Sequence, residues 1–588
     1  MKNLILAFAC LLCAQQHANL SAQHLDDAPS SRTAQNPCAP KSPGSAVPEP
    51  DDLRSRNGEL TVDLTIRNYV EPGGSVRYCY ITSDNKEAPT LRLNPGDLLI
   101  LNLKNDLIEI GPPANLPAHR HMGHEKKKDE KRTADPCMSG MMSAISTNLH
   151  FHGLTIPPVC HQDDVLNTSI QPRDEPFQYR FRIPADEPPG LYWYHPHIHG
   201  FSKAQVLGGA SGALIVEGIE RAARQVAGLP ERVVIIRDRD LLNPDAPPSK
   251  SEPVIPKMLL DRDGDAANNG TGFGKPAKDL SINYVPVPYP DYPPAVIEMK
   301  PGERQLWRVL NASAITYLNL AVLFNRVPQQ LGLVALDGVP LNQSGKFPDS
   351  ISWQTHLGVP PGSRVEFILT GPPLKTTGLF VTRTVDTGPG GENDPNRAIA
   401  LIKASADAPE PHSILGATPA PLPLPTSTWL GDVAPVRTRR LYFSEMPTNP
   451  DDPNSPTEFY LTVDGQTPVV FDPSAPPSIV AEQGTVEDWI IENRSNELHA
   501  FHIHQLHFLL LDYLGKPVNE PFLRDTVNVP YFTDRALTYP SVRLRMDFRD
   551  PNTVGTFLYH CHLLEHEDGG MMGLIRVEPT HKSLASGQ

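Results

Sequence analysis

Four short segments of the sequence each carry two histidines separated by one residue. On a β-strand, residues two apart point to the same face and lie about 6–7 Å apart, so each pair could bind one metal cluster. Eight imidazoles are enough for three metal ions if one ion takes two histidines and the other two take three each. Imidazole is a good ligand for copper. The pairs are His150 and His152, His195 and His197, His502 and His504, and His560 and His562.

A second set of candidate ligands points to the opposite face of the strands. The cysteine of this set lies between the two histidines of the last pair and must therefore have the opposite orientation. Two imidazoles, one thiolate and one weak thioether are the ligands of a blue-copper electron-transfer site. An electron arriving at the sulfur would have a short covalent path to the neighbouring histidines. The members of this set are His499, Cys561, His566 and Met571.

Chance has to be weighed against this interpretation. A single buried histidine is most often a hydrogen-bonded core residue, and any one pair could arise by coincidence. Four pairs, together with a cysteine that one pair brackets, favour the metal-binding interpretation heavily. His199 shares the parity of His195 and His197, so strand geometry alone does not exclude it, but it is expected to lie next to the ligands or to face solvent rather than to bind metal.

The segments HFHG, HPHIHG, HAFHIHQ and HCHLLEHEDGGMM resemble the four copper-binding signatures of the multicopper oxidase family. The similarity extends over nearly all of the expected mature chain and includes KPGERQLWRVLNAS and LGVPPGSRVEFIL. It implies an all-β fold of three cupredoxin-like Greek-key β-sandwich domains, with the histidine cluster between the first and the third. Ala500 stands where the family often has Pro, and Gln505 where it often has Gly, but neither is a ligand.

The resemblance also implies four copper ions: one type 1, one type 2 and two type 3. The implied reaction is one-electron oxidation of phenolic or related donors, coupled to the four-electron reduction of dioxygen to water. The implied ligands are His150 and His502 for type 2 copper, His152, His195 and His562 for one type 3 copper, His197, His504 and His560 for the other, and His499, Cys561, His566 and Met571 for type 1 copper.

Reduction of dioxygen to water also consumes four protons, so acids are expected near the cluster. Glu567 directly follows a type 1 ligand, and Asp163 or Asp164 follows the first histidine pair. Family members carry an acid at similar places. Asp163 is preferred, because a solvated loop acid is a serious alternative for Asp164.

The reducing substrate is less well defined by the residues: phenols, aromatic amines and cuprous ion are all candidates. Cuprous-ion oxidation is the main alternative activity. The segment 119–142 contains His, Met and Cys residues that could recruit Cu(I), but a flexible charged insertion is favoured there. Family cuprous oxidases usually carry a Met-rich segment near type 1 copper, where this chain has only Met446. A non-catalytic cupredoxin scaffold is opposed by the complete ligand set, and a copper nitrite reductase by the expected number of domains.

The elements that must position these ligands are predicted to be strands. From Leu60 onward, short β-branched and apolar runs are cut by Pro and Gly, and 64 prolines argue against a helical protein. A Pro-Gly phrase followed by an apolar strand recurs at Asn94 and Lys300, and with Gln for Pro at Glu482. These repeats suggest three related domains joined by a Pro-rich linker, with a long surface loop at 242–294. The expected domains are 57–220, 228–405 and 435–580, with the linker at 406–434.

The chain as a whole is predicted to be exported, to the periplasm or the outside. Lys2 precedes an apolar run, so residues 1–22 resemble a secretory signal, and 23–56 are expected to form a loosely ordered arm. Acylation at Cys10 or Cys13 is the alternative, but the preceding residues fit it poorly. A length of 588 residues suits several domains, and a net charge of -15 argues against nucleic acid and anionic membranes as partners.

Export also permits disulfides. Removal of the signal leaves five cysteines, and Cys561 is the one flanked by histidines. If the other four pair, three connectivities are possible. These four are Cys38, Cys79, Cys137 and Cys160.

Overall fold

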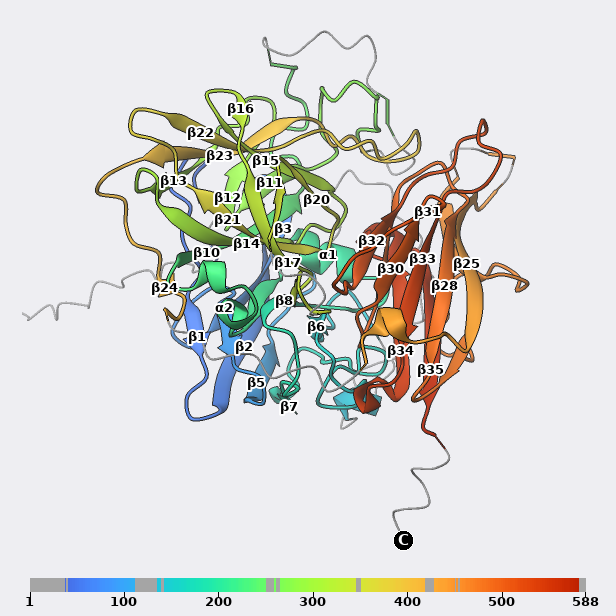
Figure 1. Ribbon diagram of the computed structural model, residues 1–588. Helices are drawn as coiled ribbons and strands as arrows, with labels where there is room; N and C mark the ends of the chain where they lie inside the picture. Colours follow the sequence, from blue (N-terminus) through green and yellow to red (C-terminus); the bar gives the residue numbers. More distant parts are fainter. Residues whose placement is uncertain are drawn as a thin grey trace, which may run out of the picture.

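The described residues form six β-sheets with only short helices, which confirms the all-β prediction. In the computed structural model the sheets pair into three cupredoxin-like sandwiches, coloured blue to teal, green to olive and orange to red in Figure 1. Within this part of the chain, no helix is long and apolar enough to cross a membrane. The expected signal and most of 119–142 lie outside the described residues. The structure describes residues 38, 41–110, 135–138, 142–249, 259–260, 265–344, 351–417, 428–449, 451–452 and 455–580.

The first domain pairs a five-stranded with a four-stranded sheet. In the four-stranded sheet, β2 and β7 alternate between buried and exposed side chains, because one face packs on the core and the other meets solvent. The helix α1 (Ser202–Leu207) connects β8 to β9, and η1 (Pro136–Met138) precedes β6. The sheet orders are β1 (Asp52–Arg54), β4 (Thr90–Leu93), β9 (Gly212–Val216), β8 (Gly190–His195), β6 (His150–His152), and β3 (Val76–Thr82), β2 (Glu59–Val70), β5 (Leu98–Asn105), β7 (Phe177–Arg182).

The second domain follows the short helices α2 (Ile219–Ala222) and η2 (Arg224–Val226). Its core is built from apolar side chains of both sheets, including Trp307 of one and Phe380 of the other. One sheet has the order β12 (Val285–Val287), β11 (Asp279–Ile282), β10 (Pro230–Arg239), β14 (Arg304–Asn311), β21 (Arg364–Thr370), β17 (Leu331–Leu336), β18 (Val339–Pro340), with β19 (Ser352–Gln354) on β17 and β24 (Ser413–Ile414) on β10. The other has the order β13 (Ala295–Met299), β23 (Arg397–Ala404), β22 (Thr377–Thr382), β15 (Leu318–Phe324), β16 (Val327–Pro328), with β20 (Leu357–Val359) on β15.

The third domain begins after η3 (Leu430–Asp432) and contains η4 (Pro551–Thr553) and the helix α3 (Leu564–Asp568). Its core includes Trp489, Phe501 and Tyr559. The sheet orders are β26 (Thr457–Val463), β25 (Arg437–Pro447), β28 (Val486–Asn493), β33 (Ser541–Asp547), β30 (Leu509–Tyr513), β31 (Lys516–Pro517), and β27 (Ile479–Glu482), β35 (Met572–Glu578), β34 (Gly555–Cys561), β29 (His499–Ile503), β32 (Thr526–Val529).

The recurring Pro-Gly phrase occupies the same place in each domain. Gly96, Gly302 and Gly484 all adopt positive φ in the turn before a strand, at 88°, 69° and 88°. The strands that follow, β5, β14 and β28, each pair in parallel with the long strand β2, β10 or β25. A glycine is favoured at this turn because a side chain would strain the left-handed backbone. The three domains are therefore variations of one strand arrangement.

Two segments differ from their predicted character. In the expected arm, residues 41–56 are ordered: Ala46 bridges Val296, Val47 is buried in the second domain, and β1 pairs with β4. The expected surface loop 242–294 contains β11 and β12, which extend a sheet by pairing with β10. Both segments have too few apolar residues to show a period, yet Val47 of the first and Leu280, Ile282 and Val285 of the second are buried in the core of the second domain. In the expected linker, β24 likewise pairs with β10.

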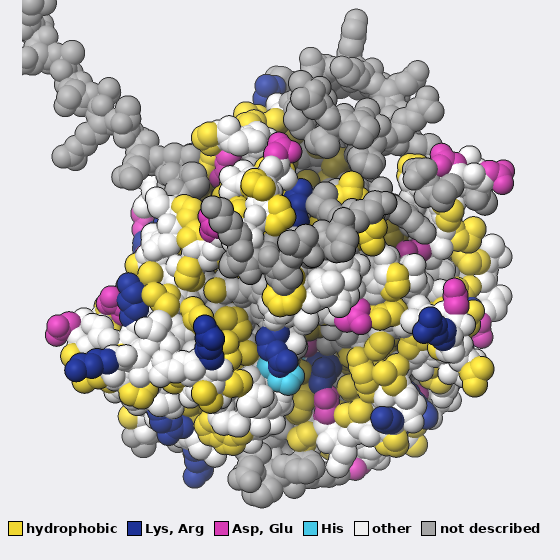
Figure 2. All heavy atoms as spheres, turned by 90° about the horizontal axis from the view of Figure 1, so that it is seen from above, with side chains coloured by type: hydrophobic (Ala, Val, Ile, Leu, Met, Phe, Trp, Pro, Cys, Tyr) yellow, Lys and Arg dark blue, Asp and Glu magenta, His cyan; other side chains and the backbone are white. Residues whose placement is uncertain are grey.

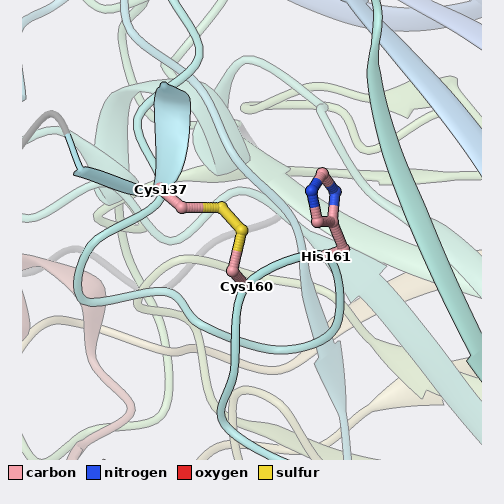
Figure 3. Close-up of side chains that lie close together, drawn as sticks. All are labelled: Cys137, Cys160 and His161. Carbon is pink, nitrogen blue, oxygen red and sulfur yellow. A yellow bond between two sulfur atoms is a disulfide. The ribbon is translucent and has the colours of Figure 1, made fainter. Parts of the chain in front are cut away.

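Two disulfides are present, and they select one of the three possible connectivities. Cys38 is bonded to Cys79, and Cys137 to Cys160. Figure 3 shows His161 next to the second bond. Because these sulfurs are bonded to each other, they do not provide thiolates for a metal beside His161. On the face drawn in Figure 2, the described acidic and basic side chains are interspersed rather than separated by sign.

Candidate metal centre

Strands of the first and third domains bring the histidine pairs together. β6 pairs with β8 so that His150 lies opposite His195, and β29 pairs with β34 so that His502 lies opposite His560. The two sheets approach each other here, since the rings of His150 and His504 stack with centroids 3.8 Å apart. All eight predicted histidines are almost completely buried. The site therefore exists only because two domains, more than 300 residues apart in the chain, are packed together.

The ring nitrogens of these histidines fall into three groups, and within each group one nitrogen per ring lies within 4.8 Å of the others. Such spacing suits nitrogen ligands of shared metal ions. In one group, the Nε2 atoms of His504 and His560 are only 3.2 Å apart. The groups are His150, His152 and His502; His152, His195 and His562; and His197, His504 and His560.

The protonation of these rings suits a metal. Burial, followed by the neighbouring imidazoles, lowers the pKa of six of the histidines well below the usual value. Burial also lowers the pKa of His560 to about 3. A neutral imidazole keeps the lone pair that a metal needs. The six are His152, His195, His197, His502, His504 and His562.

Seven of the eight rings have a buried nitrogen without a hydrogen-bond partner. Unpartnered buried polar atoms in such number are unusual, and a bound metal ion would account for them. The residues present therefore fit a copper cluster. The atoms are Nε2 of His150, His195, His197 and His502, Nδ1 of His152 and His504, and both ring nitrogens of His562.

In four of these rings, Nδ1 makes a hydrogen-bonding contact that holds the ring in one orientation. A ring whose Nδ1–H donates outward carries its lone pair on Nε2, so these contacts determine which nitrogen faces the metal. The contacts are His150 Nδ1 to both carboxylate oxygens of Asp163 (3.0 Å), His195 Nδ1 to Pro196 O (2.9 Å), His502 Nδ1 to Asp525 O (2.8 Å) and His560 Nδ1 to Cys561 O (2.9 Å).

The second predicted centre lies on the other face of β34. Cys561 Sγ is 3.6 Å from His499 Nδ1 and 3.8 Å from His566 Nδ1, and these two nitrogens are 3.2 Å apart. Met571 is fully buried, and its backbone oxygen accepts the Cys561 N–H at 3.1 Å. Burial raises the pKa of the Cys561 thiol, the free cysteine of the described residues. A metal ion would offset that cost by binding the thiolate.

Two carboxylates next to this centre were not predicted from the sequence. Glu445 Oε1 lies 3.1 Å from Nε2 of His499, and Glu497 Oε1 lies 3.2 Å from Nε2 of His566. Phe459 stacks on the His566 ring with centroids 4.4 Å apart. Glu497 is two residues from His499 and so was within reach of the parity argument. Glu445 comes from β25, more than 50 residues away, and no local spacing indicates it.

The predicted proton carriers have different environments. Asp163 is buried, contacts His150 and also accepts the Phe151 N–H at 2.9 Å. Asp164 instead accepts hydrogen bonds from Asn167, within its own turn. The structure thus places Asp163, and not Asp164, against the histidine group. Burial raises the pKa of Asp164 nonetheless.

Glu567 is fully buried between histidines of two domains. One carboxylate oxygen lies 3.6 Å from His197 Nε2 and the other 3.3 Å from His560 Nδ1. Burial, with a smaller contribution from Asp568, raises its pKa well above the usual value. His199, which was not expected to be a ligand, donates its backbone N–H to Met142 Sδ and packs edge-on against Phe471.

The second domain also reaches the histidines, although its sequence shows no ligands. The Arg364 guanidinium binds the Asp525 carboxylate through two hydrogen bonds of 2.9 and 2.8 Å. Asp525 Oδ1 in turn lies 3.2 Å from His152 Nε2. Gly362 is so close that a Cβ there would lie 2.7 Å from His562 Nε2. Both contacts depend on domain packing, so no spacing of ligand residues in the sequence indicates them.

Comparisons with known proteins give the same family for both halves of the site. Two family models, each described as multicopper oxidase, match residues 142–221 and 448–581. The multicopper oxidase mco of Staphylococcus aureus is 23% identical over 439 residues, which are 74% of this chain and 77% of that protein. The laccase of Bacillus subtilis is 21% identical over 470 residues, covering 74% and 81%.

Solved structures share the whole fold. A multicopper oxidase from Campylobacter jejuni, described as a metallo-oxidase, superimposes with a TM-score of 0.59 at 23% identity and covers 92% of this chain and 98% of that one. One from Aquifex aeolicus superimposes with a TM-score of 0.59 at 18% identity and covers 91% and 99%. With both family models lying over the histidine and cysteine segments, the chain belongs to the copper-binding multicopper oxidase family.

Proposed function

We propose that this protein oxidises a reducing substrate one electron at a time at the Cys561 centre and reduces dioxygen to water at the eight-histidine centre. The observation that carries the proposal is the position of Cys561 between His560 and His562. The cysteine belongs to one ligand group and the two histidines belong to the other. Four copper ions are proposed, one of type 1, one of type 2 and two of type 3, with the ligands named from the sequence.

Bound copper would supply the redox chemistry, since each ion can hold one electron. The protein itself provides the path for the electron and a buried environment for the ligands. Cys561 is joined to His560 and to His562 by one peptide bond each, so an electron on the sulfur reaches either histidine through covalent bonds and does not have to cross a gap between domains. The burial of both ligand groups excludes bulk water from the path.

Asp163 and Glu567 are proposed to hold the protons that the reduction consumes. Asp163 is on the first-domain side of the histidines, and Glu567 is on the side of α3. Burial favours the protonated form of Glu567, so this carboxyl can carry a proton into a region with little water. Asp164 is a weaker candidate, because its hydrogen bonds stay within its own turn.

Phenols and aromatic amines are the proposed donors, and cuprous ion is the second candidate. The first choice is supported by the laccase among the relatives and by the aromatic Phe459 over His566. Cuprous ion is supported by the carboxylates that lie against Nε2 of His499 and Nε2 of His566. It is also supported by Met446, which is next to Glu445 in the sequence and 49% exposed. A soft thioether and carboxylates could together receive a metal ion.

Export to the periplasm or the outside is proposed for the same protein. The proposal is supported by the apolar run near the N-terminus and by two disulfides, which persist mainly in oxidising compartments. Cell fractionation tests it: activity in the exported fraction supports it, and activity confined to the cytosol contradicts it.

The deciding experiment measures absorption and oxygen uptake of the copper-loaded protein. A strong band at about 600 nm with phenol-driven uptake supports the oxidase proposal. Uptake with cuprous ion alone would favour the second donor, and the absence of both band and uptake would refute the enzyme. In Cys561→Ser, we expect the band to vanish and uptake to fall at least about 100-fold, with the eight-histidine centre still loaded.

A further inference from the structure

A cavity of about 210 Å³ lies far from the histidines in sequence, where three parts of the chain meet. Residues 41–51 close one side, and the turn after β3 closes another. The third side comes from β10 and the tight turn between β11 and β12. Asn283 of that turn joins these parts, because its side-chain amide donates to Pro48 O at 2.8 Å and to Val233 O at 2.9 Å.

The cavity contains a buried positive charge that has no counter-ion of its own. Arg237 lines the cavity and is only 2% exposed. Its Nε and Nη2 donate to the hydroxyl and the carbonyl of Ser211, but its Nη1 has no hydrogen-bond partner. Among the described residues, no carboxylate lies within ion-pair distance of Arg237. A buried guanidinium in this state is costly unless an anion compensates it.

A second guanidinium increases the excess of positive charge. Arg77 and Arg237 sit over the Tyr284 ring, with their Cζ atoms 4.3 and 3.9 Å from its centroid. Glu87 pairs with Arg77, so this one carboxylate has to serve both guanidinium groups. Lys41 also lines the cavity and interacts electrostatically with Glu87. Burial, with the charge of Arg77 as a further cause, lowers the pKa of Arg237.

The acids at the cavity interact with other groups, and none of them lies within ion-pair distance of Arg237. Glu49 is engaged elsewhere, 3.3 Å from Arg232 and hydrogen-bonded to the His412 N–H. Lys86 is matched by Asp84 at 3.0 Å. The remaining acid, Asp51, is exposed. The lining thus carries three basic side chains, Lys41, Lys86 and Arg237, and three acidic ones, and among the described residues the buried guanidinium of Arg237 is the one of these three cations that combines deep burial with the lack of an ion pair.

Strained backbone is concentrated around the same cavity. Four of its lining residues adopt positive φ although none is glycine: Asn85 at 63°, Ala88 at 41°, Asn283 at 45° and Tyr284 at 67°. Residues held in this region of φ persist where the surroundings impose it, and they cluster at binding sites. Asn283 and Tyr284 form the two-residue turn between β11 and β12, and this turn places the Tyr284 ring against both guanidinium groups.

We infer that this cavity binds one small anion with oxygen acceptors, a phosphate or a carboxylate, through Nη1 of Arg237. Lys41 and Lys86 stand at its rim and attract the anion, and Tyr284 holds both guanidinium groups in place. The anion supplies the missing counter-charge and binds residues 41–51 to the first and second domains. It is distinct from any ligand of the histidine centre.

The test is calorimetric titration of the full copper-loaded protein with inorganic phosphate and, separately, with malonate. Sodium chloride at the same ionic strength serves as the blank. We expect one saturable site for at least one of the two anions, and the tighter binder identifies the chemistry. The absence of a saturable site for either anion would overturn the proposal. Binding that changes the copper absorption and is unaffected by substitution of Arg237 would also overturn it.

Variants locate the site. Arg237→Gln should weaken binding at least tenfold, since a charge-assisted hydrogen bond is lost. If this variant does not fold, the double variant Lys41→Gln with Lys86→Gln tests the site instead, and its affinity for the anion should fall three- to tenfold. Lys104→Gln is the matched control, because Lys104 pairs with Asp106 as Lys86 does with Asp84, but away from the cavity. Equal binding by all variants would refute the inference.

Discussion

At the scale of single residues, two adjacent aspartates show how the environment assigns roles. Asp163 and Asp164 have the same side chain and similar positions in the sequence. Only Asp163 is turned toward His150, with both carboxylate oxygens 3.0 Å from its Nδ1. A carboxylate in that place holds the ring in one orientation and raises its strength as a ligand. Asp164 stabilises a turn through Asn167.

The first prediction follows from this pair. Asp163→Asn should lower oxygen uptake or copper occupancy by about 10–100-fold, because the charge that orients His150 is removed. Asp164→Asn is the control, with an expected change of less than about twofold, as is usual for sites away from the metal. Steady-state uptake and metal analysis of both variants measure the effect. Equal losses in the two variants would contradict the assignment.

A second prediction concerns the buried Glu187 in the first domain. Burial, reinforced by Asp186 and Asp550, raises its pKa to about 8, and the Thr155 N–H that it accepts only partly opposes this. Because the folded pKa is above the unfolded value, the group's stabilising contribution is complete below about 4.5 and is lost as pH rises through about 8. Each pH unit in that window should cost up to about 1.4 kcal/mol.

Glu187→Gln removes this proton linkage while keeping a carbonyl for Thr155. Urea unfolding of both proteins at pH 5 and pH 8 measures it, and the stability of the variant relative to the original protein should be greater at pH 8 than at pH 5. A difference that does not change with pH would show that Glu187 does not titrate in this window.

At the scale of elements, two turns of the second domain with similar sequences have different structural roles. Gly302 in KPGER and Gly362 in PPGSR both adopt positive φ, at 69° and 85°. A Cβ at Gly302 would meet nothing within 4 Å, whereas one at Gly362 would lie 2.7 Å from His562 Nε2. The first turn needs glycine for its backbone alone, and the second also needs it for the approach to a ligand.

Gly302→Ala and Gly362→Ala separate these two effects. Each should lose roughly 1–2 kcal/mol of folding stability from the left-handed backbone. Only Gly362→Ala should also displace His562 and reduce copper at the eight-histidine centre, while the band at about 600 nm persists. Metal analysis and absorption spectra distinguish them. Full copper content in Gly362→Ala would mean that the turn can move without affecting the ligand.

At the scale of the whole molecule, the second domain supports a site built by the other two. Arg364 is fully buried and binds Asp525, which lies against His152 of the first domain and His502 of the third. The same guanidinium donates to Leu191 O at 3.0 Å. One side chain therefore connects all three domains next to the metal ligands.

Arg364→Lys should reduce copper occupancy and lower the melting temperature, because an ammonium group cannot replace the two parallel hydrogen bonds. Arg545→Lys is the matched control, since Arg545 binds Asp488 through two nitrogens, at 2.8 and 3.2 Å, within the third domain. It should lower the melting temperature without loss of copper. Copper loss in both variants would indicate a general effect of instability and would contradict the specific role of Arg364.

Local spacing in the sequence was sufficient to predict the features of this protein that depend on strand geometry. Side chains alternate along a strand, so the sequence alone determined that each histidine pair shares a face and that Cys561 opposes its neighbours. Turn chemistry likewise placed Gly96, Gly302 and Gly484 before equivalent strands. These features follow from contacts between residues only a few positions apart.

Tertiary structure alone decided which distant groups meet. Four cysteines allowed three pairings, and only the folded chain selected one. Arg364 and Asp525 are 161 residues apart, and Glu445 reaches His499 from another sheet. The cavity at Arg237 likewise requires two domains and residues 41–51. No periodicity encodes such contacts, because they arise from the packing of separate domains, whose interfaces depend on the combined shape and charge of many side chains.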